Sequence, residues 1–288
     1  MYWIVTDSTI DMPKDWVDAQ ENFRVLCMSY RLDGEEHVPD GTDEDSRAIY
    51  QALRGGKVIT TAQINSESWR SCFEALLREG HDVLAVIFSS GLSGTYQAAA
   101  TAAEELRARY PERRLEVIDS LCASAGEGLL VSCALQNRAA GMSLADNARW
   151  VREHTQHVVH WFTVDDLMFL RRGGRVSATS AYLGTMIRIK PILHVDGKGC
   201  LIPRAKVQGR KKSLRALAEK LKENIVEPEK QTVLISHGDC EEDARALAEM
   251  IRETCPVRDI RLSYIGPIIG AHSGPGTVAV FFLGSGTR

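Results

Sequence analysis

The stretch "VLAVIFSSGLSGTYQAAA", residues 83–100, passes from an apolar run through a turn of serines and glycines into an alanine-rich segment. The apolar run predicts a strand that ends near Ser90, and the alanine-rich segment predicts a helix over residues 94–110. A strand, a small-residue turn and a helix form a geometry in which backbone N–H groups converge on an anion. The stretch therefore predicts an α/β fold and an anion-binding turn.

The rest of the first half alternates in the same way. Apolar runs at 3–8 and 115–120 predict strands, and helical patterns lie at 45–54, 66–79 and 124–140. Strands that alternate with helices of this length predict right-handed crossovers and a doubly wound, mostly parallel sheet. The predicted strands end in Asp-Ser or Ser-Ser, which places polar side chains at the carboxyl edge, where such sheets bind ligands.

The pattern changes after residue 150. "HWFTVDDLMFLRRGGR" (160–175) predicts a strand and a short helix, and "KPILHVDGKGCLIPRAKVQG" (190–209) predicts a hairpin that turns near Asp196–Gly199. Further helices are expected at 211–225 and 241–253, with a buried strand at the end of the chain. We expect two domains: a Rossmann-like α/β domain at 1–155 that carries the anion-binding loops, and an α/β domain at 156–288 with a more antiparallel sheet.

Composition excludes several classes of function. The net charge of −3 argues against a broad nucleic-acid surface, although basic clusters occur at 171–175 and 204–212. No apolar run approaches the length of a membrane span, and the first residues show no secretion signal. The seven cysteines are scattered without a CxxC pair, which is typical of a reducing cytosol and predicts no zinc site. We expect a cytoplasmic protein without metal, nucleic acid or membrane span; a transient membrane contact stays open.

The turn at 89–95 holds the first candidate site. Ser93 can cap a helix that starts at Gly94, and the glycines can simply shape the turn. However, Ser89, Ser90 and Thr95 add more hydroxyls than capping needs. No lysine follows the second glycine, so the turn is not a P-loop and nucleotide hydrolysis is not expected. The turn is better suited to a single small negative group.

Other polar positions have two interpretations each. Thr61 in "VITTAQINSESW" is a second ligand candidate or a solvated loop residue, and His272 in "IGPIIGAHSGPG" is a third or a surface histidine. Asp7 and Asp119, each followed by serine at a predicted strand end, either serve function or bind backbone N–H groups in their own turns.

Two further patterns of polar residues are interpreted as features of the fold and not as functional sites. His154, His157 and His160 recur every three residues, but 157 and 160 would face opposite sides of a strand, so a metal site is not expected. In Asp165–Asp166, one residue is expected to cap the following helix.

Seven segments resemble successive motifs of the DegV family, in the family's order and over essentially the whole chain. They are "VTDST", "TTAQINSESW", "SSGLSGTYQAA", "VIDSLCASAGEG", "LRRGGRVS", "KPIL" with "DGKG", and "IGPIIGAHSGPGTVAVFF". The resemblance implies a two-domain α/β fold that binds one long-chain fatty acid. It also implies a role as the carrier subunit of a fatty-acid kinase, in which a separate ATP-binding protein phosphorylates the carboxylate to an acyl phosphate.

The resemblance also implies site residues. Ser93 matches the family's carboxylate-binding serine and Thr61 its partner, with Gly94 and Thr95 at the helix start and His272 near the carboxylate. The chain departs from the family pattern at 62–65, where Ser-Gln-Pro-Ser is common, and at Gln208, where arginine is common. The second departure bears on contacts with a kinase.

Physical chemistry is compatible with a fatty acid. A desolvated carboxylate needs charge-assisted hydrogen bonds of about 1.5–3 kcal/mol each, which two hydroxyls and a helix N-terminus can supply without lysine or arginine. At about 0.8 kcal/mol per methylene, roughly fourteen buried methylenes contribute on the order of 11 kcal/mol, so the tail should dominate affinity. Candidate tail contacts are Ile64, Met186, Ile187, Ile268 and Ile269, although each is better explained as an ordinary core residue.

Three hypotheses follow. The leading one is a non-catalytic fatty-acid carrier that uses no cofactor. The second is an enzyme acting on a small phosphorylated or carboxylated metabolite, with Asp7, Asp119 or His272 as acid or base. The third is an interaction module whose basic segment 204–212 docks an acidic partner.

Overall fold

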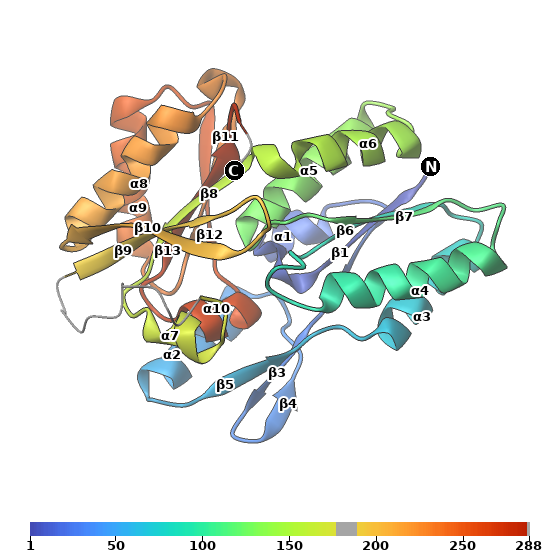
Figure 1. Cartoon of the computed structure of the whole chain (residues 1–288), viewed down its shortest axis with the longest axis horizontal. Coiled ribbons are helices and arrows are strands. Elements are labelled where there is room, and N and C mark those ends of the chain that lie inside the picture. The colour runs from blue at the N-terminus through green and yellow to red at the C-terminus, as the bar shows by residue number, and fades with distance from the viewer. Residues whose placement is uncertain (177–188, 287–288) are drawn as a thin grey trace.

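The computed structural model describes residues 1–176 and 189–286, which form two main sheets and a small peripheral sheet (Figure 1). In these ranges no helix combines the length and the apolar character needed to cross a bilayer.

The N-terminal sheet is fully parallel, with strand order β2-β1-β6-β7. Its strands are β1 (Trp3–Asp7), β2 (Phe23–Leu26), β6 (Val83–Ile87) and β7 (Leu115–Asp119). Successive residues of β6 are buried in different clusters, Leu84 on one face and Ala85 on the other. Helices α3 (Ser66–Arg78) and α4 (Thr95–Arg109) cover one face, and α5 (Ala125–Ala139) and α6 (Leu144–His154) cover the other. The predicted doubly wound sheet is confirmed.

The C-terminal sheet is mixed and mostly antiparallel, with order β10-β9-β8-β13-β11-β12; only β11 and β12 pair in parallel. Its strands are β8 (Val158–Thr163), β9 (Ile189–Val195), β10 (Leu201–Gln208), β11 (Thr232–His237), β12 (Asp259–Tyr264) and β13 (Val278–Leu283). The β9–β10 hairpin is the predicted one, and Asp196 Oδ1 accepts hydrogen bonds from the N–H groups of Lys198 and Cys200 in its turn. Helices α8 (Arg210–Asn224) and α9 (Glu241–Thr254) cover one face.

Helix α5 joins the two main sheets. It packs against β1 and β6 of the N-terminal sheet and against β8, β11 and β13 of the C-terminal sheet. The α/β fold class is therefore confirmed in both halves. The division at residue 155 stays a prediction; the last strand of the N-terminal sheet ends at Asp119 and the first of the C-terminal sheet begins at Val158.

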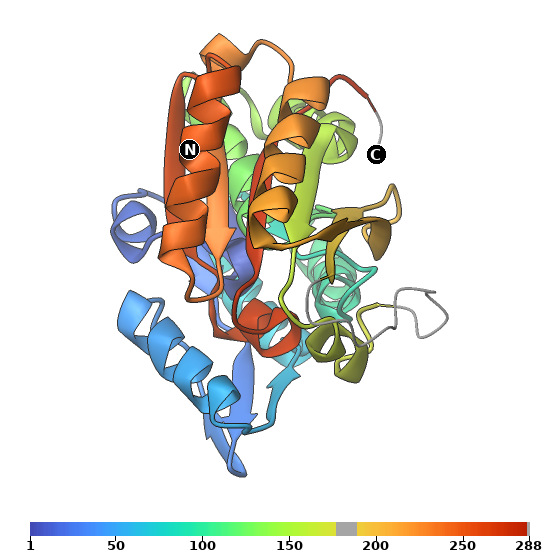
Figure 2. The ribbon, with the colours of Figure 1, turned by 90° about the vertical axis from the view of Figure 1, so that its left-hand side faces the viewer.

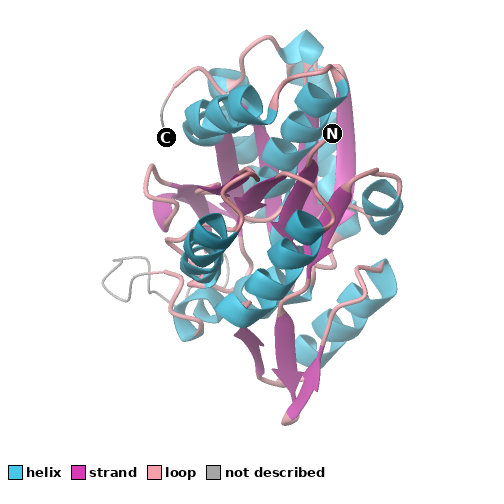
Figure 3. Ribbon diagram, turned by 90° about the vertical axis from the view of Figure 1, so that its right-hand side faces the viewer, coloured by secondary structure: helices cyan, strands magenta, loops and turns pink. Residues whose placement is uncertain are grey.

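The peripheral sheet and its helices bring distant segments together, as Figures 2 and 3 show at the bottom of the molecule. The sheet consists of β3 (Ser29–Leu32), β4 (Glu35–His37) and β5 (Ile59–Ala62), all antiparallel. Helix α10 (Pro267–Ser273) packs against α2 (Asp43–Arg54), β5 and α7 (Met168–Arg172). The remaining short helices are α1 (Lys14–Asp18) and the 3₁₀ turns η1 (Ser8–Ile10), η2 (Thr155–His157) and η3 (Pro228–Lys230).

A buried carboxyl pair lies between η1 and α5. Thr9 Oγ1 is 2.6 Å from Asp7 Oδ1 and 2.8 Å from Glu127 Oε2. A hydroxyl has one proton, so Thr9 cannot donate to both carboxylates. Asp7 also accepts the N–H groups of Thr9 and Phe88, which favours the charge on Asp7. Glu127 therefore holds a proton and donates it to Thr9, and burial raises its pKa well above the ordinary value.

Asp11 joins four elements beside this pair. Its Oδ2 accepts from the hydroxyl of Ser124 at the start of α5, and its Oδ1 accepts from Gly266 N, 2.9 Å away, just before α10. Ser124 Oγ lies 3.0 Å from Ser236 Oγ on β11. Burial raises the pKa of Asp11 to about 7. The contacts of Asp11 position the helix that carries His272.

Replacing Glu127 by glutamine tests the proton on this carboxyl group. Because burial raises the folded-state pKa of Glu127 above 4.5, its stabilising contribution is complete below about pH 4.5 and is lost as the pH rises toward the folded-state pKa. Glutamine can donate to Thr9 at every pH. We expect Glu127→Gln to gain stability relative to the wild type by up to about 1.4 kcal/mol per pH unit between pH 5 and 8, measured by urea unfolding.

The exposed Glu104→Gln variant on α4 is the matched control and should show no such trend. A stability difference between Glu127→Gln and the wild type that stays constant from pH 5 to 8 would contradict the assignment.

Candidate functional site

The main cavity lies between the C-terminal sheet and the carboxyl edge of the N-terminal sheet, where doubly wound folds bind ligands. Its volume is about 280 Å³. Most of its walls are apolar, contributed by strands β8, β9, β10 and β13, by α10 and by the loops after β6 and β7; examples are Phe88, Leu92, Phe162, Leu170, Ala279 and Phe281. An apolar cavity with a few polar groups is typical of a small-molecule site.

Four of the five predicted site residues line this cavity: Thr61, Ser93, Gly94 and His272. Thr61 Oγ1 lies 2.8 Å from His272 Nε2. The fifth, Thr95, is buried beside the cavity, and its Oγ1 is 3.0 Å from Ser93 Oγ. The structure therefore brings together a hydroxyl and imidazole cluster from β5, the β6–α4 turn and α10.

The local structure of the β6–α4 turn differs by one residue from the expectation. Helix α4 begins at Thr95, so Gly94 rather than Ser93 is the N-cap residue. Ser93 Oγ still accepts a hydrogen bond from Thr95 N, at 3.3 Å. A Cβ on Gly94 would overlap Oε1 of Gln63. The glycine thus allows the loop after Thr61 to approach the serine turn closely.

His272 is neutral at physiological pH. Burial and, to a lesser extent, the nearby positive charge of Arg175 together lower its pKa to about 4. Its Nδ1 faces the backbone of Gly173, where a Cβ would overlap the ring. The imidazole can therefore orient the Thr61 hydroxyl by hydrogen bonding, but it adds no charge at pH 7.

Arg175 is a cavity residue that the sequence analysis missed. Its Nε donates to the carbonyl of Leu92, 3.1 Å away, and an Nη1 hydrogen to the carbonyl of Gly173. Within residues 1–176 and 189–286 it has no carboxylate partner, and burial lowers its pKa. The cavity lining therefore includes a cation, although the sequence analysis expected none to be required. The only sequence signal was the "LRRGGRVS" motif, which contributed no ligand-binding residue to the predicted site.

Asp7 and Asp119 have backbone partners. Asp7 accepts from the N–H groups of Thr9 and Phe88, and Asp119 Oδ1 accepts from Ser90 N and Leu121 N at 3.1 and 3.0 Å. Neither is among the described residues that line the main cavity. Their contacts agree with the structural interpretation of both strand ends.

The candidate tail residues divide into three groups. Ile268 and Ile269 line the main cavity. Ile64 is buried in the core beside α3 and is not among the described lining residues. Met186 and Ile187 lie outside the described residues.

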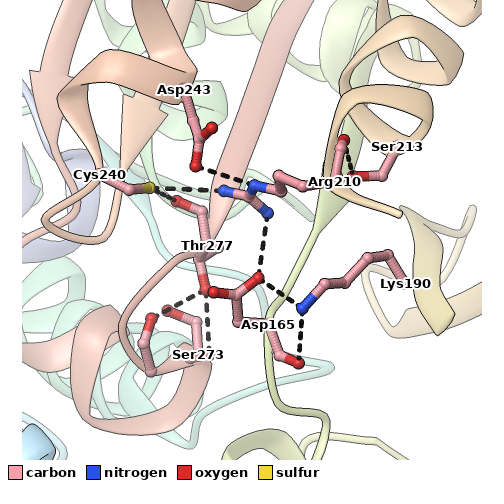
Figure 4. A network of polar contacts seen from close by, with 9 residues as sticks. Asp165, Lys190, Arg210, Ser213, Cys240, Asp243, Ser273 and Thr277 are labelled. Atoms are coloured by element: carbon pink, nitrogen blue, oxygen red, sulfur yellow. Dashed lines mark hydrogen bonds and ion pairs between the residues drawn. The ribbon is translucent and has the colours of Figure 1, made fainter. Parts of the chain in front are cut away.

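The structure also bears on the three regularly spaced histidines and on the Asp165–Asp166 pair. No group of three metal-ligating side chains occurs in the described part of the chain. His160 lines the main cavity instead, with its Nε2 accepting from Ala123 N. Asp166 Oδ1 accepts from Met168 N at the start of α7, but the N-cap residue of this helix is Leu167, and its side chain forms no cap hydrogen bond. Asp165 forms ion pairs with Lys190 and Arg210 (Figure 4).

The Arg175→Gln variant tests the electrostatics of His272. Removing the positive charge should raise the pKa of His272, but the value should stay below 6.5 because burial is the larger cause of the shift. Imidazole ¹⁵N chemical shifts followed from pH 3 to 8 give this pKa directly. Arg171→Gln, a neighbouring arginine outside the cavity lining, should leave it unchanged; equal pKa values in both variants would contradict the assignment.

Relatives of the chain are found in both sequence and structure comparisons. A family model described as "Uncharacterised protein, DegV family" matches residues 2–285. A DegV domain-containing protein of Clostridium perfringens is 44% identical over 284 residues, which cover 98% of this chain and 97% of the relative.

Two solved structures share the fold over 99% of both chains. One, described as "Fatty Acid Binding of a DegV family Protein from Thermus thermophilus", has a TM-score of 0.89 at 28% identity. The other is described as DegV, a fatty acid binding protein from Bacillus subtilis, with a TM-score of 0.83 at 26% identity. The family model and the close relative together show that this chain belongs to the DegV family.

Proposed function

We propose that this protein binds one long-chain fatty acid, with the acyl chain in the main cavity and the carboxylate at Ser93 and Thr61. The observation that carries the proposal is an apolar cavity that ends in a cluster of hydroxyls beside a half-buried arginine. The fatty-acid binding described for the relatives from Thermus thermophilus and Bacillus subtilis supports it.

The head-group contacts in this proposal require the His272 tautomer that carries its proton on Nε2. In that tautomer neutral His272 donates to Thr61 Oγ1, which leaves the threonine proton free to donate to the carboxylate. Ser93 Oγ accepts from Thr95 N and can likewise direct its own proton to the ligand. His272 thus acts through Thr61, whereas the sequence analysis expected it to contact the head group itself.

Arg175 supplies the charge in this proposal. A carboxylate that leaves water keeps its charge only where hydrogen bonds or a cation compensate the desolvation. Arg175 is itself partly buried without a carboxylate partner among the described residues. The carboxylate and the guanidinium therefore each compensate the desolvation free energy of the other.

The acyl chain accounts for most of the binding free energy. At about 0.8 kcal/mol per buried methylene, even ten methylenes contribute on the order of 8 kcal/mol before ordering costs, more than the few hydrogen bonds at the head. The hydroxyls then determine the orientation of the chain, with its charged end at the β6–α4 turn.

The protein is not itself a catalyst in this proposal, but presents the carboxylate to a separate ATP-dependent kinase. A carboxylate oxygen would attack the γ-phosphorus of ATP on the partner, which yields the acyl phosphate and ADP. Arg204 and Lys206 on β10 and Lys211, Lys212 and Arg215 on α8 are exposed and form a basic surface for an acidic partner. The enzyme alternative is not favoured, because Asp7 and Asp119 are engaged by backbone N–H groups, Asp7 also by the Thr9 hydroxyl, and neither is among the described residues that line the main cavity.

The double variant Ser93→Ala, Thr61→Ala tests the head site. We expect the protein to fold and to bind palmitate about ten-fold or more weakly, because two hydrogen bonds to a charged group are lost. Titration calorimetry measures the affinity, and mass spectrometry of the organic extract identifies any lipid retained on purification.

The exposed Ser90→Ala variant in the same turn is the control and should bind as the wild type does. Unchanged palmitate affinity in the double variant would show that the carboxylate lies elsewhere. A wild type that neither retains nor takes up any long-chain fatty acid would refute the function.

The variant Lys211→Glu, Lys212→Glu tests the kinase surface. Arg210 is unsuitable for charge reversal, because it forms ion pairs with Asp165 and Asp243 that hold β8, α8 and α9 together (Figure 4). With an ATP-binding fatty-acid kinase subunit from the same organism, we expect acyl-phosphate formation to fall at least ten-fold while palmitate affinity stays unchanged.

The control reverses two charges at the far end of α8 and beyond it, Lys222→Glu with Lys230→Glu, both exposed in the structure. Equal acyl-phosphate formation in the two variants would place the kinase contact on another surface.

A further inference from the structure

A second hollow lies on the other side of the head-group residues. It has a volume of about 220 Å³ and is lined by the segment between α2 and β5, by α7 with its C-terminal loop and by α10. Figure 1 shows α2, α7 and α10 next to one another at this corner of the molecule. Thr61, Arg175 and His272 line both this outer hollow and the main cavity, so these three side chains form the partition between them.

The outer hollow is basic, in contrast to the apolar main cavity. Lys57, Arg172 and Arg175 line it, and no aspartate or glutamate is among its described lining residues. The guanidinium of Arg172 stacks over the ring of Phe169, with 4.7 Å from Cζ to the ring centroid, which holds the cation at the hollow's wall. Three positive groups that converge without a carboxylate between them favour an anion.

Two of the three cations have no counter-charge among the described residues. Lys57 forms an ion pair with the exposed Asp33 at the rim. Arg172 and Arg175 form none with the described residues. Arg175 donates through Nε and Nη1 to backbone carbonyls, and no acceptor of its Nη2 hydrogens is found within residues 1–176 and 189–286.

A single fatty carboxylate does not account for the positive charge of this outer hollow. Its one negative charge is satisfied on the cavity side by Ser93, Thr61 and Arg175 in the proposed function. Lys57 and Arg172 contact only the outer side. A phosphoryl group carries up to two negative charges and three terminal acceptor oxygens, which match further cationic donors.

We propose that the outer hollow is a phosphoryl-binding subsite, in which Lys57 and Arg172 bind the terminal oxygens of a phosphate group. The shared chemistry is a phosphate oxyanion, either attached to an acyl chain that lies in the main cavity or free in solution. The first source rests on the proposed fatty-acid function, and the second does not.

The experiment compares two variants with two lipids that differ in the head group. Arg172→Ala removes a cation from the hollow, and Arg171→Ala removes the neighbouring exposed arginine, which is not among the lining residues. Palmitate and hexadecyl phosphate are titrated into each protein by calorimetry. We expect Arg172→Ala to bind hexadecyl phosphate about ten-fold more weakly and palmitate as the wild type does, while Arg171→Ala binds both lipids normally. Lys57→Gln should repeat the selective loss.

A second arm uses inorganic phosphate and ³¹P line broadening, with the same variants. Broadening that Arg172→Ala abolishes and Arg171→Ala preserves supports a site for free phosphate; a selective effect on hexadecyl phosphate without broadening supports the lipid-borne source. If Arg172→Ala and Arg171→Ala behave alike toward both probes, the subsite is refuted. If the wild type binds neither lipid but phosphate broadening depends on Arg172, the fatty-acid function fails and the subsite stands.

Discussion

Two buried carboxyl groups at the end of the first strand hold both sides of the candidate site. Asp7 accepts the N–H of Phe88, which leads into the turn that bears Ser93, and Asp11 accepts the N–H of Gly266, which leads into the helix that bears His272. Burying two acidic side chains a few residues apart is costly unless each is fully hydrogen-bonded. Glu127 is a third buried carboxyl group beside Asp7. Because Glu127 is protonated and neutral, it adds no second negative charge next to Asp7.

Among the described residues, the lining of the main cavity combines one arginine with several neutral donors. Burial keeps His272 uncharged, so Arg175 carries the positive charge at the head of the main cavity, and the hydroxyls of Thr61 and Ser93 contribute direction more than charge. The same three-residue partition separates an apolar space from a basic one. A ligand with a long apolar tail and an anionic end matches this polarity, since each part finds the environment that compensates its desolvation.

Some elements escaped prediction because their local signals are weak. Strands β2 to β5 have only three or four residues each and are partly exposed, with charged residues such as those of "EEH" in β4, so alternation cannot be recognised. Helix α6, "LADNARWVREH", buries Leu144, Ala148 and Val151 at i, i+4 and i+7, an apolar stripe that the sequence analysis did not use. Arg175 was overlooked for another reason: an arginine in a basic cluster is usually solvated, and only packing against Leu92 and Gly173 brings it into the cavity.

The sequence by itself determined the doubly wound N-terminal sheet, the β9–β10 hairpin, the family and most of the candidate head-group residues. Periodicity, turn residues and ordered motifs are local properties, and they can be recognised in the sequence without a structure. Only the tertiary structure decided that Thr61 and His272, 211 residues apart, share a hydrogen bond, that His272 is neutral, and that a basic hollow lies behind them. Contacts, burial and the pKa shifts they cause depend on which distant elements pack together, and no local pattern encodes that packing.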